Sequence, residues 1–459
     1  MELGSWIDSV LSGHRTWEES FGPYERHGSL EVNDEAVGSA LGELMSRLEN
    51  NYPFFHPRYA GQMLKAPHPV AIAGYLAAML VNPNNHALDG GPATAEMEVD
   101  AVAQLARMFG LDEHIGHLTS SGTIANLEAL FVARESHPSL GIAFSDQAHY
   151  THSRMCNLLG VAGFPVGTDD TGRIDLDEVE TLARSGKIGT VVVTTGSTGL
   201  GAIDRVDEAL GLKERYGVRI HVDGAYGGFF AIAGRNRELG ASLRIEAGPW
   251  QAIANCDSVV VDPHKHGLQP YGCGAVLFAD PKVAKHYLHD SPYTYYTAEG
   301  SRHLGEISIE CSRAGAAAAA FWLTLRLFPL DPGGLGSILA ATRRAALEWA
   351  SVVQGSNGLC LYQMPELDIV TYFPVRQSLA AVDSTSARIF EEAMTGPDPI
   401  FVSLLRVTPS DMARRHRNHA QETPTGIDDV RILRSVLMKP ESEAWVAPLL
   451  SRIEELAQG

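Results

Sequence analysis

The chain has 459 residues, of which 45% are hydrophobic and 20% are charged, values typical of a folded globular protein with roughly two or three domains. Its 36 basic and 55 acidic side chains give a net charge of −19, which argues against nucleic acid and anionic membrane surfaces as partners. Five cysteines without a CxxC motif argue against a disulfide framework and a zinc ribbon. We therefore expect reduced thiols, no bound metal and a cytoplasmic location.

The N-terminal residues 1–55 mix short helical patterns with chain breakers such as Gly22-Pro23, so we expect an arm rather than an independent core. Met1–Ser20 contains acidic residues and no continuous apolar run, unlike a signal peptide. The longest apolar stretch, Ala71–Val81, has about half the length that a membrane-spanning helix needs. We expect this stretch to be a buried helix.

Short apolar runs rich in β-branched residues alternate with helical stretches from residue 56 to about residue 330. The predicted strands are residues 142–145, 190–194, 219–222, 258–261 and 274–278. Because the runs are continuous rather than alternating, we expect both faces of the strands to be buried, as in a parallel sheet covered by helices. A helix is predicted over Cys311–Phe328, and the composition changes after the segment 329–334 to a smaller α+β region.

Polar segments follow several of these strands, and ligands of open α/β sheets bind where the strands end. In the segment 118–127, small hydroxylated residues and a glycine lead into a helix, whose free N–H groups suit a phosphate. An ordinary serine or threonine helix cap is an equally good interpretation of that segment. His149 follows the next strand, and a single histidine there is more often structural than catalytic.

Two further side chains follow later strands. Asp223 is followed by glycine and alanine, which would let a flat ligand approach its carboxylate, although a turn aspartate has the same pattern. Lys265 lies between His264 and His266 directly after an apolar strand. A lysine desolvated there can form a Schiff base, whereas the alternative is a lysine that extends to the surface.

The order of these features along the chain is more informative than any one of them. A phosphate-type loop, a histidine, an aspartate and a lysine each follow a separate strand. Pyridoxal 5′-phosphate (PLP) requires this combination, because it has a phosphate, a flat ring, a ring nitrogen that favours an acidic partner, and an aldehyde that condenses with lysine.

The sequence resembles the fold-type I PLP enzymes from about Pro53 to Leu449, and among them the group II amino-acid decarboxylases, relatives of aromatic-amino-acid, tyrosine and glutamate decarboxylases. The motifs that carry the resemblance are Thr119–Leu130 (family TSGGTEANL, with Ile124 for the usual Glu), Ser145–His149 (SDQAH), Gly196–Gly199 (GTT), His221–Tyr226 (HVDAAY), Pro263–Lys265 and Glu310–Arg313. The resemblance implies an α/β fold of the aspartate-aminotransferase type, with a mostly parallel central sheet and a smaller C-terminal α+β domain. It also implies an arm for dimerisation over residues 1–55, a large PLP-binding domain over 56–330 and a small domain over 331–459.

Residue roles follow from the resemblance. Lys265 would bind the cofactor covalently, and Asp223 would pair with the pyridine nitrogen. The other implied cofactor contacts are Gly122 and Thr123 at the phosphate, His149 and Ala225 on the two ring faces, Thr198 near the ring substituents, and His264 near the phosphate or the substrate carboxylate. Asp262 is expected to turn away from the phosphate or to pair with a cation, because a carboxylate repels a dianion.

The implied activity is decarboxylation of an L-amino acid to the corresponding amine and CO2 in a homodimer with shared active sites. Tyr293 or Tyr295, in the loop Asp290–Thr297, would donate a proton to the product, although interface packing explains such tyrosines equally well. Arg434, in a strand-like stretch, would hold a substrate carboxylate or else be an exposed strand residue. Carbon–carbon lyase, aminotransferase and oxidative decarboxylation–deamination chemistry remain alternatives, because the same site supports them.

Overall fold

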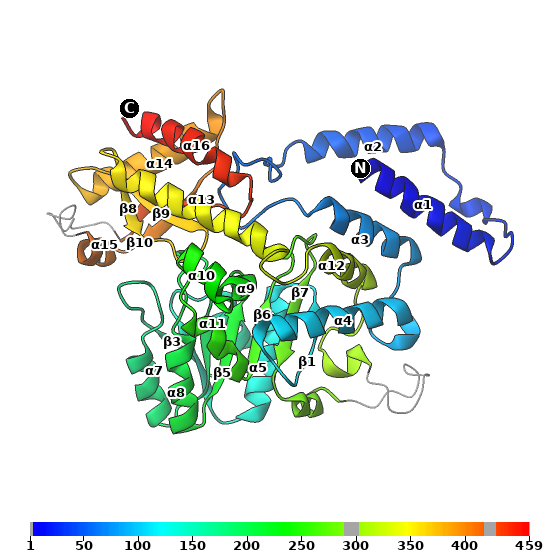
Figure 1. The fold of residues 1–459 in the computed structure, drawn as a ribbon, viewed down its shortest axis with the longest axis horizontal. Helices are drawn as coiled ribbons and strands as arrows, with labels where there is room; N and C mark the ends of the chain where they lie inside the picture. The colour runs from blue at the N-terminus through cyan, green and yellow to red at the C-terminus, as the bar shows by residue number, and fades with distance from the viewer. Residues whose placement is uncertain (1–2, 289–302, 417–427, 459) are drawn as a thin grey trace.

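The computed structural model describes residues 3–288, 303–416 and 428–458, and its large domain is built around a seven-stranded sheet (Figure 1). The strand order is β1-β7-β6-β5-β4-β2-β3. The neighbouring strands β6 and β5, β5 and β4, β4 and β2, and β2 and β3 pair in parallel. Strand β7 runs antiparallel to both β1 and β6. The strands are β1 (Ile115–Thr119), β2 (Gly141–Ser145), β3 (Gly163–Val166), β4 (Ile188–Thr194), β5 (Arg219–Gly224), β6 (Ser258–Val261) and β7 (Gly274–Phe278). The predicted mostly parallel sheet is confirmed.

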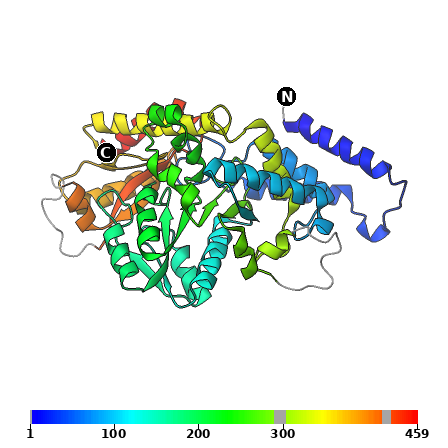
Figure 2. The same ribbon diagram turned by 60° about the horizontal axis from the view of Figure 1, so that its bottom comes forward.

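Helices cover both faces of this sheet, which explains the continuous apolar strands (Figures 1 and 2). Val259 and Val261 of β6 pack into one hydrophobic cluster, whereas Val260 packs into another on the opposite face. The helices of this domain are α4 (Pro92–Phe109), α5 (Gly122–Ser136), α6 (Thr151–Leu159), α7 (Leu176–Arg184), α8 (Val206–Tyr216), α9 (Ala231–Gly234), α10 (Arg237–Leu243), α11 (Gly248–Ala252) and α12 (Gly315–Leu327).

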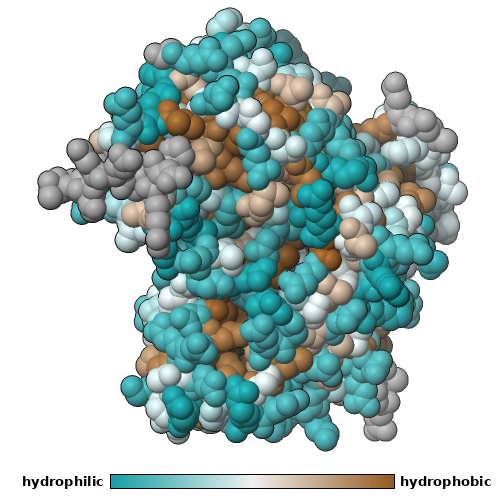
Figure 3. All heavy atoms as spheres, turned by 60° about the vertical axis from the view of Figure 1, so that its left-hand side comes forward, coloured by the Kyte–Doolittle hydropathy of each residue, from teal (hydrophilic) through white to brown (hydrophobic). Residues whose placement is uncertain are grey.

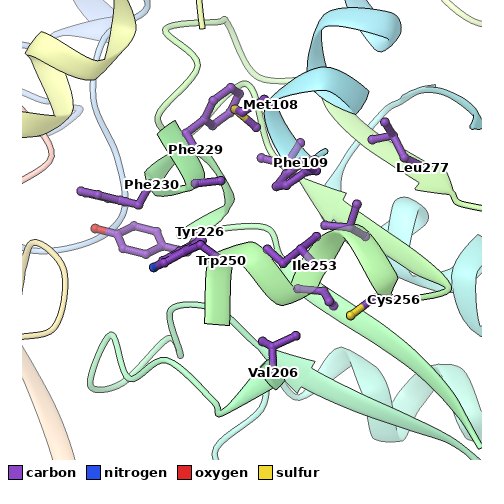
Figure 4. Packing of buried hydrophobic residues seen from close by; sticks show 14 of the residues in the cluster. Met108, Phe109, Val206, Tyr226, Phe229, Phe230, Trp250, Ile253, Cys256 and Leu277 are labelled. Atoms are coloured by element: carbon purple, nitrogen blue, oxygen red, sulfur yellow. The ribbon is translucent and has the colours of Figure 1, made fainter. Parts of the chain in front are cut away.

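The centre of the large domain is an aromatic cluster beside the end of β5 (Figure 4). Trp250, Phe229 and Phe230 are completely buried there, and Tyr226 is nearly so. Aromatic side chains contribute large buried areas, so this cluster fixes the segment that directly follows β5. That segment also forms part of the wall of the candidate active site described below.

The smaller C-terminal part carries a four-stranded antiparallel sheet with the order β10-β11-β9-β8, as predicted for an α+β domain. Its strands are β8 (Leu359–Gln363), β9 (Ile369–Pro374), β10 (Ser403–Val407) and β11 (Val430–Val436), and its helices are α13 (Leu335–Gly355), α14 (Leu379–Thr395), α15 (Pro409–Arg415) and α16 (Ser442–Gln458). The side of the molecule where this domain lies is mainly hydrophilic, with hydrophobic side chains in separate patches (Figure 3).

The N-terminal helices lie at the opposite side of the molecule (Figure 1). Neither α1 (Leu3–Glu19) nor α2 (Asp34–Leu48) buries a side chain. The expectation of a buried helix over 71–81 was only half right, because α3 (Pro69–Val81) buries one face and leaves Met79 and Val81 about half exposed, at 51% and 50%. Its buried face is made of small residues and packs closely on α12: a Cβ at Gly74 would lie 3.0 Å from the Cα of Ala320. Among the described residues, no helix is long and apolar enough to cross a membrane.

Gly227 brings the segments after β4 and β5 into direct contact. A Cβ at this position would lie 2.1 Å from the carbonyl oxygen of Thr195 and 2.8 Å from Cδ1 of Leu367. We predict that Gly227→Ala lowers the free energy of unfolding by about 2 kcal/mol or more, because backbone must move to accept the methyl group. Gly355→Ala is the control, since its Cβ would meet nothing within 4 Å. Urea unfolding measures both, and equal stability of the two variants would contradict this account.

Candidate active site

A cavity of about 390 Å³ lies where the parallel strands of the large sheet end. All the residues expected to contact the cofactor line it: Gly122, Thr123, His149, Thr198, Asp223, Ala225, His264 and Lys265. Residues to which the sequence analysis assigned no role complete the wall, among them Gln62, Met63, Leu64, Asn126, Tyr226 and Tyr271. The structure therefore brings together six segments of the chain, within residues 62–64, 121–126, 149–151, 194–198, 223–226 and 262–271.

One end of the cavity is the beginning of α5. Ser121 caps this helix by accepting a hydrogen bond from the backbone N–H of Ile124 at 3.3 Å. Gly122 leaves no room for a side chain, because a Cβ would lie 2.5 Å from Oδ2 of Asp262. The free N–H groups and the positive end of the helix dipole make this end of the cavity suitable for a phosphate group.

The carboxylate of Asp262 lies beside this helix end and is only 2% exposed. Its Oδ2 is 3.0 Å from Nζ of Lys265 and 3.5 Å from Nε2 of His264. Its Oδ1 accepts no hydrogen bond from the described part of the chain. The expectation that Asp262 pairs with a cation is confirmed, and this ion pair holds the amine of Lys265 at the cavity wall.

Asp223, at the end of β5, is 5% exposed and also lines the cavity. Its Oδ2 accepts a hydrogen bond from Nε2 of His152 at 2.8 Å, and its Oδ1 accepts one from the backbone N–H of Ala225 at 3.1 Å. Burial raises the pKa of this carboxyl, but its interactions with His152, His221 and Lys265, above all the hydrogen bond from His152, outweigh burial and hold the pKa below its ordinary value. Asp223 is therefore an ionised and almost completely buried carboxylate in the wall of the cavity.

Two histidines near Asp223 are neutral. Burial is the main cause that lowers the pKa of His149, whose Nδ1 lies 2.9 Å from Oγ1 of Thr151. His221 is fully enclosed, and burial lowers its pKa to about 3. Its ring nitrogens are hydrogen-bonded to Ser258 Oγ and Asn126 Oδ1, both at 2.8 Å. This arrangement joins β5 to β6 and α5, directly behind the cavity.

Contacts with the small domain fix the segment that carries Lys265. Asp368 accepts hydrogen bonds from Tyr226 Oη at 2.6 Å and from His266 Nε2 at 2.8 Å. All three side chains are buried. Asp368 of the small domain thus holds both His266, which is next to Lys265, and the segment after β5.

Arg434 lies in β11, as predicted, but behind the cavity wall rather than on it. Its guanidinium donates to the carbonyl oxygens of Thr198 at 2.7 Å and of Gly199 at 3.1 Å. It also donates to Gln62 Oε1 at 3.4 Å. Arg434 therefore positions two segments whose Gln62 and Thr198 face the cavity. Tyr293 and Tyr295 lie outside the described residues.

His152 is the important site residue that the sequence analysis missed. It lies three positions after His149 in α6, and its imidazole contacts a strand end 71 residues further along the chain. A motif alone did not reveal this contact, because His152 follows no strand directly. The spacing of two histidines by three residues next to a strand end was the only available signal.

The residues present fit PLP. The α5 end accommodates a phosphate, the ionised Asp223 suits a protonated ring nitrogen, and Lys265 supplies an amine, all in one cavity. Together with the sheet and the small domain, this site defines a fold-type I PLP enzyme.

Comparisons with known proteins identify the family. The domain described as "Pyridoxal-dependent decarboxylase conserved domain" matches residues 44–332. The L-tyrosine decarboxylase of Enterococcus faecium is 27% identical over 448 residues, covering 74% of this chain and 72% of that protein. The L-aspartate decarboxylase of Thermococcus kodakarensis is 27% identical over 340 residues, covering 72% and 83%. The structure of mouse CSAD shares the fold, with a TM-score of 0.78 at 18% identity over 99% of this chain and 98% of that one.

The chain belongs to the pyridoxal-dependent decarboxylase family. It is a PLP-dependent carboxy-lyase that acts on an amino acid, and the predicted family, fold class, cofactor and reaction class are confirmed.

The buried His221 predicts a pH effect on stability. The unfolded chain binds a proton at this histidine below pH 6.5, whereas in the folded protein its pKa is about 3. The unfolded state therefore binds more protons, and stability falls as the pH is lowered below 6.5. In His221→Gln, the slope of unfolding free energy against pH should be shallower by up to about 1.4 kcal/mol per pH unit. Urea unfolding at several pH values measures the slope.

His27→Gln, at an exposed position, is the control for this measurement. An unchanged slope in His221→Gln would contradict the prediction.

Proposed function

We propose that the enzyme converts an L-amino acid into the corresponding amine and CO2 in this cavity, with Lys265 as the lysine that binds PLP and Asp223 as the partner of its ring nitrogen. The observation that carries this proposal is the convergence of Lys265, an ionised buried Asp223 and the start of α5 on one cavity. When bound, PLP supplies an electron sink that stabilises the negative charge left on the substrate's α-carbon by loss of CO2.

The side chains around Lys265 have defined tasks in this proposal. Oδ2 of Asp262 lies 3.0 Å from Nζ of Lys265 and holds the ammonium form of the lysine whenever the substrate amine replaces it. Gly122 and Thr123 bind the phosphate, because both lie at the start of α5 and line the cavity. His149 and Ala225 contact the two faces of the ring. Asp223 keeps the ring nitrogen protonated, which is the charge state in which the ring withdraws electrons best.

The remaining site residues of the proposal are Thr198, His264, Arg434 and the loop tyrosines. Thr198 would lie near the ring substituents of bound PLP, and His264 would lie on the side of the phosphate or the substrate carboxylate, since both residues line the cavity. A direct contact of Arg434 with the substrate carboxylate does not fit its place behind the cavity wall, so in this proposal Arg434 acts by holding the backbone of Thr198 and Gly199. Tyr293 or Tyr295 donates the proton that completes the amine.

The cavity favours a substrate with an apolar or aromatic side chain. Met63, Leu64 and Tyr271 contribute apolar surface to its wall. Among the described residues that line it, the cationic or basic ones are Lys265, His149 and His264, all of which already have tasks at the cofactor. A substrate with a second carboxylate would need a further cation, so we rank aromatic amino acids above aspartate.

We also propose that the enzyme is a cytoplasmic homodimer with shared active sites. Leu41, Leu44, Met45 and Leu48 form one apolar stripe on α2, and each is about half exposed. A second copy of the chain would cover this stripe, which supports residues 1–55 as a dimerisation arm ahead of a PLP-binding domain and a small domain. All described cysteines are free thiols, which supports a reducing compartment.

The proposed reaction predicts equal amounts of amine and CO2. Incubation of the holoenzyme with each of the twenty amino acids should give both products with an aromatic substrate, and Lys265→Ala should lose more than about 99% of the activity because no amine binds the cofactor. Lys282→Ala, at an exposed lysine, is the matched control and should keep full activity. An aldehyde with ammonia and peroxide as the main products, or an active Lys265→Ala variant, would contradict the proposal.

The proposed dimer predicts a specific effect of charge on α2. Sedimentation should give twice the chain mass for the wild type, and Leu41→Glu combined with Leu44→Glu should shift the protein towards monomer, because two buried apolar contacts become charges. Ser39→Glu, on the opposite side of α2, should remain a dimer. A wild-type protein that is monomeric and active at low concentration would refute the shared active site.

A further inference from the structure

His152 is a completely buried histidine that contacts the site without lining the cavity. It lies in α6, and its Nε2 is 2.8 Å from Oδ2 of Asp223. The ring lies beside Phe144, with the ring centroids 6.0 Å apart. Burial of a polar side chain costs free energy unless a hydrogen bond compensates for the lost contact with water. The hydrogen bond to Asp223 is therefore the interaction that explains the position of His152.

The hydrogen bonds of His152 determine which of its nitrogens carries the proton. Nε2 faces a carboxylate oxygen, so this nitrogen must donate. Nδ1 is buried and has no hydrogen-bond partner in the part of the chain that the structure describes. An imidazolium would place an N–H group there without an acceptor, whereas a neutral ring leaves only a lone pair. The geometry therefore favours the neutral tautomer with the proton on Nε2.

The contact restricts Asp223 to one orientation. Oδ2 receives the His152 donor and Oδ1 receives the backbone N–H of Ala225, so neither oxygen can rotate without breaking a buried hydrogen bond. Each carboxylate oxygen can accept a second hydrogen bond, and Asp223 lines the cavity. The free acceptor capacity of the carboxylate is thus available to a ligand in the cavity.

We propose that His152 is a positioning residue that acts as a neutral hydrogen-bond donor and fixes the carboxylate of Asp223 towards the ring nitrogen of bound PLP. This inference rests on the proposed pairing of Asp223 with that nitrogen. The region around the start of α6 then contributes two residues to the site, because His149 lies two residues before the helix begins and His152 lies in its first turn. The ring of His152 itself does not contact the cofactor, since it is absent from the cavity wall.

A cofactor analogue separates this role from general support of the fold. The analogue is pyridoxal phosphate with a C–H group in place of the ring nitrogen, which keeps the phosphate and the aldehyde but cannot pair with Asp223. The full-length protein is freed of cofactor, and the dissociation constants of PLP and of the analogue are measured for wild type, His152→Phe and His152→Gln. Phenylalanine has no donor, whereas glutamine offers a neutral N–H at a comparable reach.

The wild type should bind PLP at least about tenfold more tightly than the analogue, a ratio that corresponds to one charge-assisted hydrogen bond. In His152→Phe this ratio should fall below about threefold while the affinity for the analogue stays nearly unchanged. His152→Gln should keep a ratio close to that of the wild type. Parallel losses for both ligands in His152→Phe would overturn the inference, because they would show a merely structural role.

Two further results test the inference separately from the proposed function. If the wild type binds both ligands equally, the pairing of Asp223 with the ring nitrogen fails, and the inference fails with it. If the wild type binds PLP more tightly than the analogue but His152→Gln binds both equally, a neutral N–H donor is not enough to position Asp223. In that case only the inference is overturned. Nitrogen NMR of the cofactor-free wild type covers the case in which the variants do not fold: a proton on Nε2 alone supports the inference, and a proton on Nδ1 contradicts it.

Discussion

A negative charge buried at the end of β5 is the constraint around which the site is organised. The carboxylate of Asp223 has almost no contact with water, so the protein must supply the hydrogen bonds that water would otherwise give. It does so with His152 and the backbone of Ala225, and in the proposed function the ring nitrogen of PLP would be the remaining positive partner. The close approach of Gly227 to Thr195 and the contact of Tyr226 with Asp368 then hold the segment after β5 in place.

Most of the fold could be predicted because its strands carry a strong and simple signal. All seven residues of β4 and all four of β6 are buried, which is why their apolar runs are continuous. The sequence patterns gave no bounds for β1, the strand before the phosphate-type loop, and did not predict β3, because β1 contains Gly116 and His117 and β3 contains Pro165, so neither has a continuous apolar run. The half-exposed α3 was misjudged for a different reason, since composition alone does not show which face of an apolar helix lacks a partner.

The sequence predicted site residues only where a titratable side chain lies at or just after the end of a strand. His149 and Lys265 each lie four residues after the end of a strand, Asp223 lies at the end of β5, and all three line the cavity. The contact of His152 with Asp223 and the contacts of Arg434 with the segments near Gln62 and Thr198 join residues that are far apart in the chain. Such contacts depend on how helices and the small domain pack against the sheet, and no local pattern encodes that packing.

The central claim is that PLP binds covalently to Lys265, and borohydride reduction of the holoenzyme followed by peptide mass spectrometry tests it most directly. Lys65 and Lys439 are the lysines to compare with Lys265, because burial lowers the pKa of each to about 8. The account predicts the reduced cofactor on the peptide that contains Lys265 and on no other. Cofactor found on Lys65 or Lys439, with an unmodified Lys265, would contradict it.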